Sequence, residues 1–318
     1  MRAVVRIEYG DTRVLRVDET EEPVPGEGQV LVRVAAAGVN MAEWHLTTGE
    51  PRVMRVAVGL TRPRKPGLGA DVAGVVAAVG AGVSRFAVGD RVFGSGMSTW
   101  AELCLARAEL LQPVPTGVSL EEAAAVPMAG YTALRALAAA GELEGRRVAV
   151  TGAGGGVGSL VVQLAKSRGA HVTAVCSARK ADFVRLLGAD DVIDYATTDP
   201  TAASVRFDAV LDFAGGLPVT RWRGALVPRG VLVLGGAENG GPLIGPLARS
   251  FRGLLTRGIK VVTLVAVENA ADIAELARLL ASGRLRSPVA RSYPLAEAAQ
   301  AVDDLRAATH PGKLVLTP

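Results

Sequence analysis

The sequence feature that most constrains the fold of this chain is a glycine-rich turn between a strand and a helix. Val148–Leu160 reads VAVTGAGGGVGSL, and the helix expected at Gly156–Arg168 repeats its apolar residues at helical spacing. As a dinucleotide fingerprint, the segment puts Ala153 at the first glycine's turn. Gly155 then lies where a pyrophosphate approaches the backbone, and Gly158 where the helix packs on the sheet. The segment therefore predicts a dinucleotide held at the start of a helix.

The rest of the chain reads as two domains. Strands are expected at Val148–Thr151, His171–Cys176, Asp191–Ile193, Ala209–Asp212, Val231–Gly235 and Lys260–Val267, with helices between several of them and single helices at 121–140, 180–187 and 270–281. This alternation predicts an α/β domain with a doubly wound parallel sheet, the Rossmann fold, over residues 119–283. Short strands punctuated by glycine predict a small β-rich barrel over 1–118. Residues 284–318, a helix at 296–307 and a strand at 313–316, are too few for a domain and are expected to return to the first.

The end of the second parallel strand indicates which dinucleotide binds. An NAD enzyme usually places an acid there for the ribose 2′-hydroxyl, whereas this strand is followed by Ser177, Arg179 and Lys180, and the first acid is Asp182. A hydroxyl and two cations suit a 2′-phosphate, so NADP(H) is the expected cofactor. The alternative is a capping serine followed by two solvated charges.

The composition of the chain excludes several kinds of site and several classes of protein. The chain has two cysteines and three dispersed histidines, too few for a zinc lobe or a histidine-rich metal site. The net charge of +4 fits a solvated surface or a preference for anionic ligands. No basic run with interleaved aromatics indicates nucleic acid, and no apolar stretch indicates a signal peptide or a membrane span. We therefore expect a cytoplasmic protein.

Motifs along nearly the whole chain resemble the zinc-independent branch of the medium-chain dehydrogenase/reductase family, the NADPH:quinone oxidoreductases and their enoyl-reductase relatives. They are Ala37–Asn40, Gly69–Val75, Gly89–Gly94, Ala124–Pro127 with Thr132-Ala133, Gly152–Gly158 with Val162–Ala165, Leu187–Asp190 with Ile193–Tyr195, and Gly312–Leu316. The resemblance implies a GroES-like catalytic domain beside the Rossmann domain, with the cofactor cleft between them.

The resemblance also implies roles for individual residues. The pyrophosphate would be held by Gly154, Gly155, Gly156 and Val157, the 2′-phosphate by Ser177, Lys180 and Tyr195, and the nicotinamide end would lie near Asn40 and Thr132. Tyr195 could equally be a surface tyrosine, and Asn40 a turn residue.

The resemblance further implies chemistry without zinc. Met41 stands where zinc-dependent relatives place a cysteine, and Gly69–Asp71 stands where they place Gly-His-Glu. Without a metal, the substrate must already be electrophilic, which fits a quinone or an α,β-unsaturated carbonyl. His45 and Pro51 occupy positions where quinone reductases often carry tyrosines. His45 is a candidate general acid or a structural histidine, and Trp44 lines the substrate pocket or packs in the core.

Three functions stay open at this point. The first is an NADPH-dependent quinone or enone reductase. The second is a specialised enoyl or ketone reductase acting on a biosynthetic intermediate, for which the basic loop Pro51–Pro66 could bind an acyl carrier. The third is an NADPH-binding structural or regulatory protein without turnover. A homodimer is expected through Lys260–Val267, because so apolar an edge strand needs a cover; the alternative cover is residues 238–256.

Overall fold

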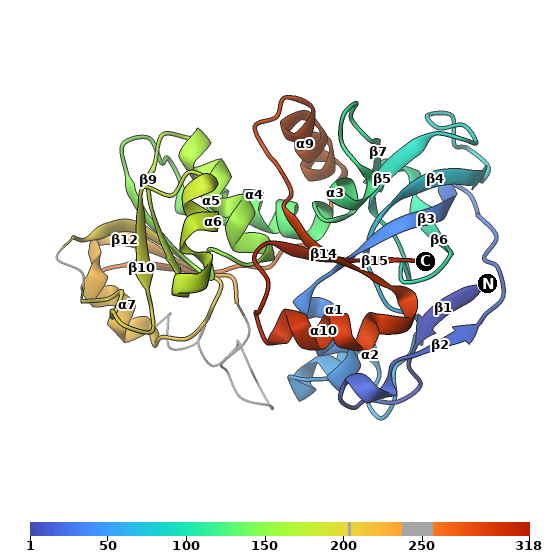
Figure 1. Ribbon diagram of the computed structural model, residues 1–318, viewed down its shortest axis with the longest axis horizontal. Helices are drawn as coiled ribbons and strands as arrows, with labels where there is room; N and C mark the ends of the chain where they lie inside the picture. Colours follow the sequence, from blue (N-terminus) through green and yellow to red (C-terminus); the bar gives the residue numbers. More distant parts are fainter. Residues whose placement is uncertain (203–204, 237–256) are drawn as a thin grey trace. The chain divides into compact units, whose positions relative to one another are not determined.

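The protein is described by a computed structural model for residues 1–202, 205–236 and 257–318, and it divides into two units. The first unit comprises residues 1–131 and 267–318, and the second comprises 132–266 (Figure 1). Residues 119–131 and 267–283, which the sequence assigns to the nucleotide-binding domain, thus belong to the first unit. The reason is packing: the helices α3 (Leu120–Ala124) and α9 (Ala270–Ala281) contact strands of that unit.

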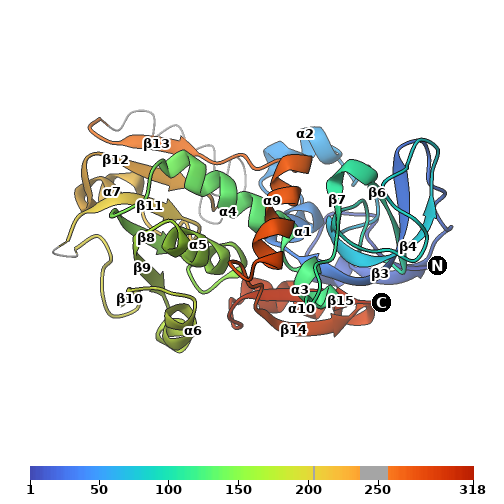
Figure 2. The same cartoon turned by 90° about the horizontal axis from the view of Figure 1, so that it is seen from above.

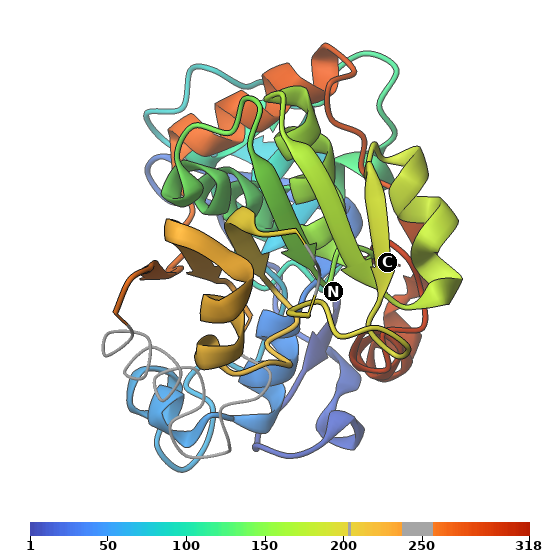
Figure 3. The same cartoon turned by 90° about the vertical axis from the view of Figure 1, so that its left-hand side faces the viewer.

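The second unit contains a six-stranded parallel sheet among its described residues (Figure 3). The strand order is β10-β9-β8-β11-β12-β13, which is the doubly wound order expected from the sequence. The bounds are β8 Arg147–Thr151, β9 His171–Cys176, β10 Asp191–Asp194, β11 Phe207–Asp212, β12 Leu226–Leu234 and β13 Lys260–Thr263. β13 pairs with β12 at one edge (Figure 2), and residues 264–267 lie beyond its end.

Helices cover this sheet on two faces. α5 (Gly156–Ser167) buries Leu160, Val161 and Leu164 against β8 and β9, and α6 (Ala181–Leu186) follows the short 3-10 turn η4 (Ala178–Lys180). α7 (Val219–Ala225) packs on the other face, because the crossover from β11 to β12 runs in the opposite direction. In its described part, the crossover at 195–206 from β10 to β11 forms turns and bends.

The first unit is built on a seven-stranded sheet that the C-terminal strand completes. The order is β14-β15-β3-β4-β5-β7, with β6 paired to β3, and β1 and β2 form a separate hairpin. The bounds are β1 Arg2–Val5, β2 Arg16–Glu19, β3 Gln29–Val39, β4 Asp71–Val79, β5 Arg91–Ser95, β6 Leu103–Arg107, β7 Leu111–Pro113, β14 Val289–Pro294 and β15 Lys313–Thr317. Because β15 pairs antiparallel with β3, the C-terminal tail takes part in the sheet of the first unit.

Short helices complete the first unit. They are α1 (Met41–Thr48), α2 (Arg55–Val58), α3, α9 and α10 (Ala298–Arg306), together with the 3-10 turns η1 (Thr12–Val14), η2 (Arg52–Met54), η3 (Ala108–Leu110) and η5 (Leu295–Glu297). Its core consists of alternating strand residues such as Val30, Val32 and Val72 around the buried Trp100.

The helix expected at 121–140 is two helices. α3 ends at Ala124 and α4 (Pro127–Ala140) begins at a proline, which lacks the amide that a continuous helix would need. Ser119 caps α3, because its hydroxyl accepts a hydrogen bond from the Glu122 backbone amide at 3.1 Å. None of the described helices is long and apolar enough to cross a membrane.

Candidate functional site

The glycine-rich turn has the shape that a dinucleotide requires. Gly152 adopts a φ of +64°, so the left-handed turn falls on Gly152 and not on the buried Ala153, where the sequence pattern predicts it. Gly155 caps α5, and a Cβ on Gly158 would lie 2.2 Å from the Gly152 carbonyl oxygen. Gly158 therefore allows the helix to pack on the turn, as the fingerprint predicts.

Lys180 crosses this turn. A Cβ on Gly154 would meet the Lys180 side chain at 2.6 Å, so the missing side chain makes room for the lysine stem. Lys180 is 7% exposed, and burial lowers the pKa of its ammonium group. Ser177 is half-buried at the start of η4 and Arg179 is exposed. Among the predicted phosphate residues, Lys180 is therefore the one whose side chain lies against the turn.

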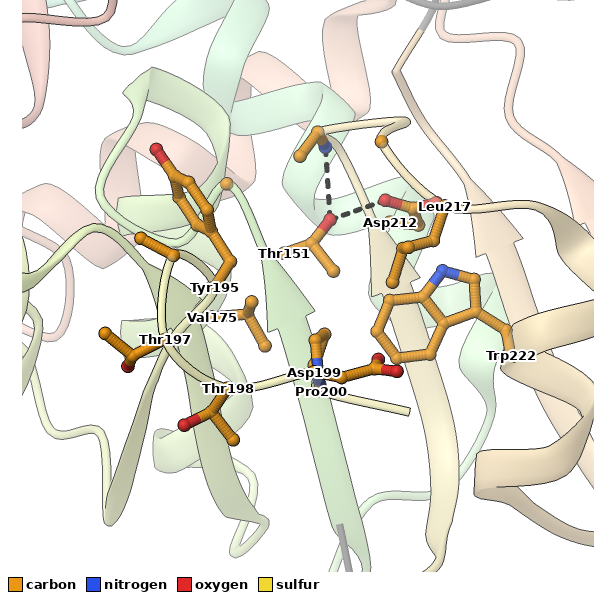
Figure 4. Close-up of a pocket in the computed structure, with 14 residues that line it drawn as sticks. Thr151, Val175, Tyr195, Thr197, Thr198, Asp199, Pro200, Asp212, Leu217 and Trp222 are labelled. Atoms are coloured by element: carbon orange, nitrogen blue, oxygen red, sulfur yellow. Dashed lines mark hydrogen bonds between the residues drawn. The ribbon is translucent and has the colours of Figure 1, made fainter. Parts of the chain in front are cut away.

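A pocket of about 480 Å³ lies at the carboxyl ends of the parallel strands. Thr151 ends β8, Asp212 ends β11 and Val175 lies one residue before the end of β9. Figure 4 shows Tyr195 and Trp222 on opposite sides of this pocket. Open parallel sheets bind their ligands at this edge, where the strand order reverses. β8 and β11 are the neighbours at that reversal.

Hydrogen bonds fix the floor of the pocket. The Thr151 hydroxyl donates to Asp212 Oδ1 at 2.6 Å and accepts from the Ala214 amide at 3.1 Å, and the Gly215 amide donates to Asp212 Oδ1 at 3.0 Å. The Trp222 indole N–H is buried without an acceptor among the described residues. Tyr195, which also lines the pocket, is 62% exposed.

Asn40 is part of a buried polar cluster in the first unit. Its Nδ2 donates to Asp71 Oδ2 at 3.0 Å, and its Oδ1 accepts from Lys313 Nζ at 2.5 Å. Lys313 Nζ also donates to the Val39 carbonyl at 3.2 Å, and the Met128 amide donates to Asp71 Oδ1 at 2.8 Å. Both ends of the Asn40 amide are held, so its orientation is fixed by Asp71 and Lys313.

A second carboxyl group joins this cluster. Glu43 is 1% exposed, and its Oε2 accepts a hydrogen bond from the Asn40 backbone amide at 2.8 Å, which completes the capping box of α1. Burial first, and then the Asp71 carboxylate, raise the pKa of Glu43 to about 8. Since Lys313 forms its ion pair with Asp71, at 3.8 Å, Glu43 carries the proton at neutral pH.

Replacement of Glu43 by glutamine should change how stability depends on pH. Between the unfolded pKa of 4.5 and the folded value of about 8, the native protein binds more protons than the unfolded chain, so its stability falls as pH rises. Glu43→Gln removes this dependence of stability on pH. Relative to the parent, the free energy of unfolding of Glu43→Gln should rise by up to about 1.4 kcal/mol per pH unit from pH 5 to 8.

Urea denaturation at each pH measures this difference. Glu21→Gln is the control, because the Glu21 carboxylate is exposed and stays hydrated when the chain folds. Parallel stability curves for Glu43→Gln and the parent would show that Glu43 is charged in the native state.

The other expected catalytic residues, His45 and Thr132, lie on α1 and α4. His45 Nδ1 is 2.7 Å from the Glu50 carbonyl oxygen, which can only accept, so Nδ1 carries a proton. Trp44 packs against the core with Arg306 4.3 Å above its ring, which favours the core reading of this tryptophan. Thr132 is half-buried on α4 and makes an interaction of its own.

Sequence reasoning missed the partners that organise these sites. Asp71 and Lys313 stood out only as motif residues, although a charge at the start of an apolar strand signals burial with a partner. Asp212 and Trp222 carried no assignment, and Asp212 ends an apolar strand in the same way. Among the described residues, no three His, Cys, Asp or Glu side chains are grouped so that they could hold a metal ion.

The chain matches known proteins over its whole length. Residues 26–135 match the family described as "Alcohol dehydrogenase GroES-like domain", and residues 187–316 match "Zinc-binding dehydrogenase". The "Quinone-oxidoreductase QR1, chloroplastic" of Triphysaria versicolor is 33% identical over 100% of this chain and 98% of its own. The "Quinone oxidoreductase" of Pseudomonas aeruginosa is 33% identical over 98% of this chain and 97% of its own. The Escherichia coli quinone oxidoreductase, solved in complex with NADPH, superposes with a TM-score of 0.85 at 25% identity, and the match covers 100% of both chains.

A parallel nucleotide-binding sheet joined to a GroES-like unit defines a medium-chain dehydrogenase fold. With relatives of this identity and coverage, the chain belongs to the medium-chain dehydrogenase/reductase family and groups with its quinone oxidoreductases. The resemblance seen in the sequence motifs is confirmed.

Proposed function

We propose that this protein is an NADPH-dependent oxidoreductase that reduces a quinone or an α,β-unsaturated carbonyl compound. The observation that most directly supports this proposal is the position of the Lys180 side chain, which lies against Gly154 at the glycine-rich turn. A buried ammonium at the place of the usual acidic residue supports a phosphorylated ribose, and the quinone oxidoreductase relatives support the reaction.

The residues present fit NADP(H). Gly154, Gly155, Gly156 and Val157 would hold the pyrophosphate at the start of α5, where the N-cap residue Gly155 has no side chain. Lys180, with Ser177, Arg179 and Tyr195, would hold the 2′-phosphate. When bound, the cofactor supplies a hydride.

The chain's own part in the reaction is orientation and proton delivery. We propose that Asn40 and Thr132 position the nicotinamide end, with the Asn40 amide held by Asp71 and Lys313. His45 is the proposed proton donor. Because its Nδ1 hydrogen is given to the Glu50 carbonyl oxygen, only Nε2 can exchange a proton with a ligand.

The first measurement compares cofactors in a Lys180→Met variant. We expect NADPH to bind the parent more tightly than NADH, and Lys180→Met to weaken NADPH about 10- to 100-fold, the loss expected for one charge-assisted contact. NADH affinity should stay within about twofold. Arg185→Met is the matched control, because Arg185 is an exposed cation paired with Asp182 on the next helix. Equal affinities of the parent for the two cofactors would refute the assignment.

A substrate screen tests the reaction itself. NADPH oxidation is followed with 9,10-phenanthrenequinone, simple enones and enoyl thioesters. Turnover of the quinone or the simple enones supports the proposal, and activity confined to thioesters would support the specialised enoyl reductase. A protein that binds NADPH and oxidises it with none of them would be a binding protein without turnover.

Three further parts of the sequence interpretation belong to the proposal. Chemistry without zinc is tested by EDTA dialysis and elemental analysis. A stoichiometric metal whose removal abolishes activity would refute it.

A homodimer through β13 is tested by light scattering, where a monomer would refute it. The alternative cover of this strand, residues 238–256, lies outside the described residues. The expected cytoplasmic location also stays a prediction, for fractionation to test, since one relative's name includes "chloroplastic".

A further inference from the structure

A second pocket, which we call the Arg6 pocket, lies within the first unit. Its volume is about 430 Å³. It is lined by Arg6, Leu46, Ala57, Val58, Arg64, Lys65, Gly67, Leu68, Gly69, Met97 and Ser98. Three of these side chains are cationic and none is acidic, and most of the others are apolar. The lining therefore combines positive charge with an apolar wall.

Arg6 is the unusual member of this lining. It is 3% exposed, and its guanidinium contacts backbone carbonyls: Nε donates to Leu46 at 2.9 Å, and Nη1 to Pro66 at 3.4 Å and Lys65 at 3.5 Å. Within the described residues, Arg6 forms no ion pair with a carboxylate, and Nη2 makes no hydrogen bond. Burial lowers the pKa of Arg6, yet an arginine stays charged in a protein.

A buried charge without a counter-charge is costly, so its retention calls for a partner. Arg55 likewise has no carboxylate partner among the described residues, but it is only half-buried. Its guanidinium donates to the Gly49 and Thr48 carbonyls and lies 4.4 Å above the Tyr9 ring, which is a structural role. Arg64 and Lys65, by contrast, are exposed at the pocket and add to its positive charge.

One hydroxyl-bearing residue, Ser98, also lines the pocket, and Thr99 follows it in the chain. A Cβ on Gly67 would be 2.4 Å from Ser98 Oγ, and one on Gly69 would be 2.4 Å from Thr99 Oγ1. Glycine at these two positions thus avoids a clash with the two hydroxyls. Thr99 Oγ1 is buried and has no hydrogen-bond partner among the described residues. Thr99 is not among the lining residues, so the hydroxyl that faces the pocket is that of Ser98.

We propose that the Arg6 pocket binds an oxyanion, a carboxylate or a phosphate group, carried on an apolar chain. The guanidinium of Arg6 would bind the oxyanion through Nη2, with Arg64 and Lys65 attracting it and Ser98 donating a hydroxyl. Leu46, Val58 and Met97 would contact the apolar chain. The pocket is lined by residues of the first unit alone, and its proposed ligand does not depend on the proposed reaction.

Calorimetry with three matched ligands tests this proposal. Hexanoate, hexyl phosphate and hexan-1-ol share one chain and differ in the head group, and saturating NADPH is present to fill the sites for its own phosphates. At least one anion should bind ten times or more tightly than the alcohol, and more weakly as salt is raised. The tighter anion identifies the head group. Equal affinity of all three ligands, or anion binding that is seen only when NADPH is left out, would overturn the proposal.

Variants assign the binding to this pocket. Arg6→Met should weaken the anion at least tenfold and leave the NADPH dissociation constant unchanged, whereas Lys180→Met should do the opposite. Arg2→Gln is the matched control, because Arg2 lies on the neighbouring strand β1 and is exposed beside Glu102. If Arg6→Met does not fold, the double variant Arg64→Gln/Lys65→Gln on the exposed loop should still weaken the anion severalfold and flatten its salt dependence. Unchanged anion binding in whichever variant folds would overturn the assignment.

Discussion

Gly158→Ala should abolish NADPH binding and lower the free energy of unfolding by at least about 3 kcal/mol. The added Cβ would lie 2.2 Å from the Gly152 carbonyl oxygen and 2.7 Å from the Ala153 Cα. Both are backbone atoms of the turn, so the contact cannot be relieved by a rotamer change. Helix α5 would have to move away from the turn, and the amides at its start would move with it.

Gly224→Ala is the control for this experiment. Gly224 lies in α7, and a Cβ there would meet nothing within 4 Å. Alanine in a helix restricts the unfolded chain, so this variant should be neutral or more stable by up to about 1 kcal/mol. Urea denaturation and a fluorescence titration with NADPH measure both variants. Wild-type affinity and stability in Gly158→Ala would show that the turn is not as tightly packed as described.

Lys313→Met should be the most damaging change in the first unit, with a loss of about 3–5 kcal/mol. It removes the cation of the cluster and leaves the fully buried Asp71 carboxylate with the Asn40 amide and the Met128 backbone amide. A buried charge that has lost its partner keeps its desolvation cost, and this cost is the physical reason for the loss.

Two comparisons separate this effect from the loss of a long side chain. Lys166→Met breaks a shorter ion pair, at 2.5 Å to Asp190, that is partly exposed, and should cost about 1 kcal/mol or less. Lys313→Met/Asp71→Asn removes the orphaned charge and should recover part of the stability. A cost for Lys313→Met no greater than that for Lys166→Met, in urea denaturation, would contradict the role of the ion pair.

Periodicity in the sequence predicts the regular elements well. The bounds expected for His171–Cys176 and Ala270–Ala281 are those of β9 and α9, because each segment repeats apolar residues at a single period. The single helix expected at 121–140 is wrong at Pro127, where a missing amide outweighs a continuous apolar pattern. α7 is not predicted by the sequence, since its seven residues are too few to establish a period, and Trp222 holds it by tertiary packing.

The sites also differ in how well the sequence predicts them. The dinucleotide turn is local in sequence, so the chain's own pattern of residues predicts Gly154, Gly158 and Lys180. The buried cluster and the Arg6 pocket are not local. Lys313 and Asn40 are 273 residues apart, and Arg6 and Leu46 are 40 residues apart. Only the pairing of β15 with β3 brings the first pair together, and no short motif carries that information.

The position of β15 has a consequence for synthesis on the ribosome. The first unit consists of two segments, and all of the second unit, residues 132–266, is made between them. A nascent chain therefore completes the parallel sheet while the other sheet still lacks β14 and β15 and Asp71 still lacks its ammonium partner. Until translation reaches Lys313, the edge of β3 that β15 will cover is open to strands of other nascent chains. Proteolysis of chains arrested near residue 287 would reveal this order, as a resistant second unit and a cleaved first unit.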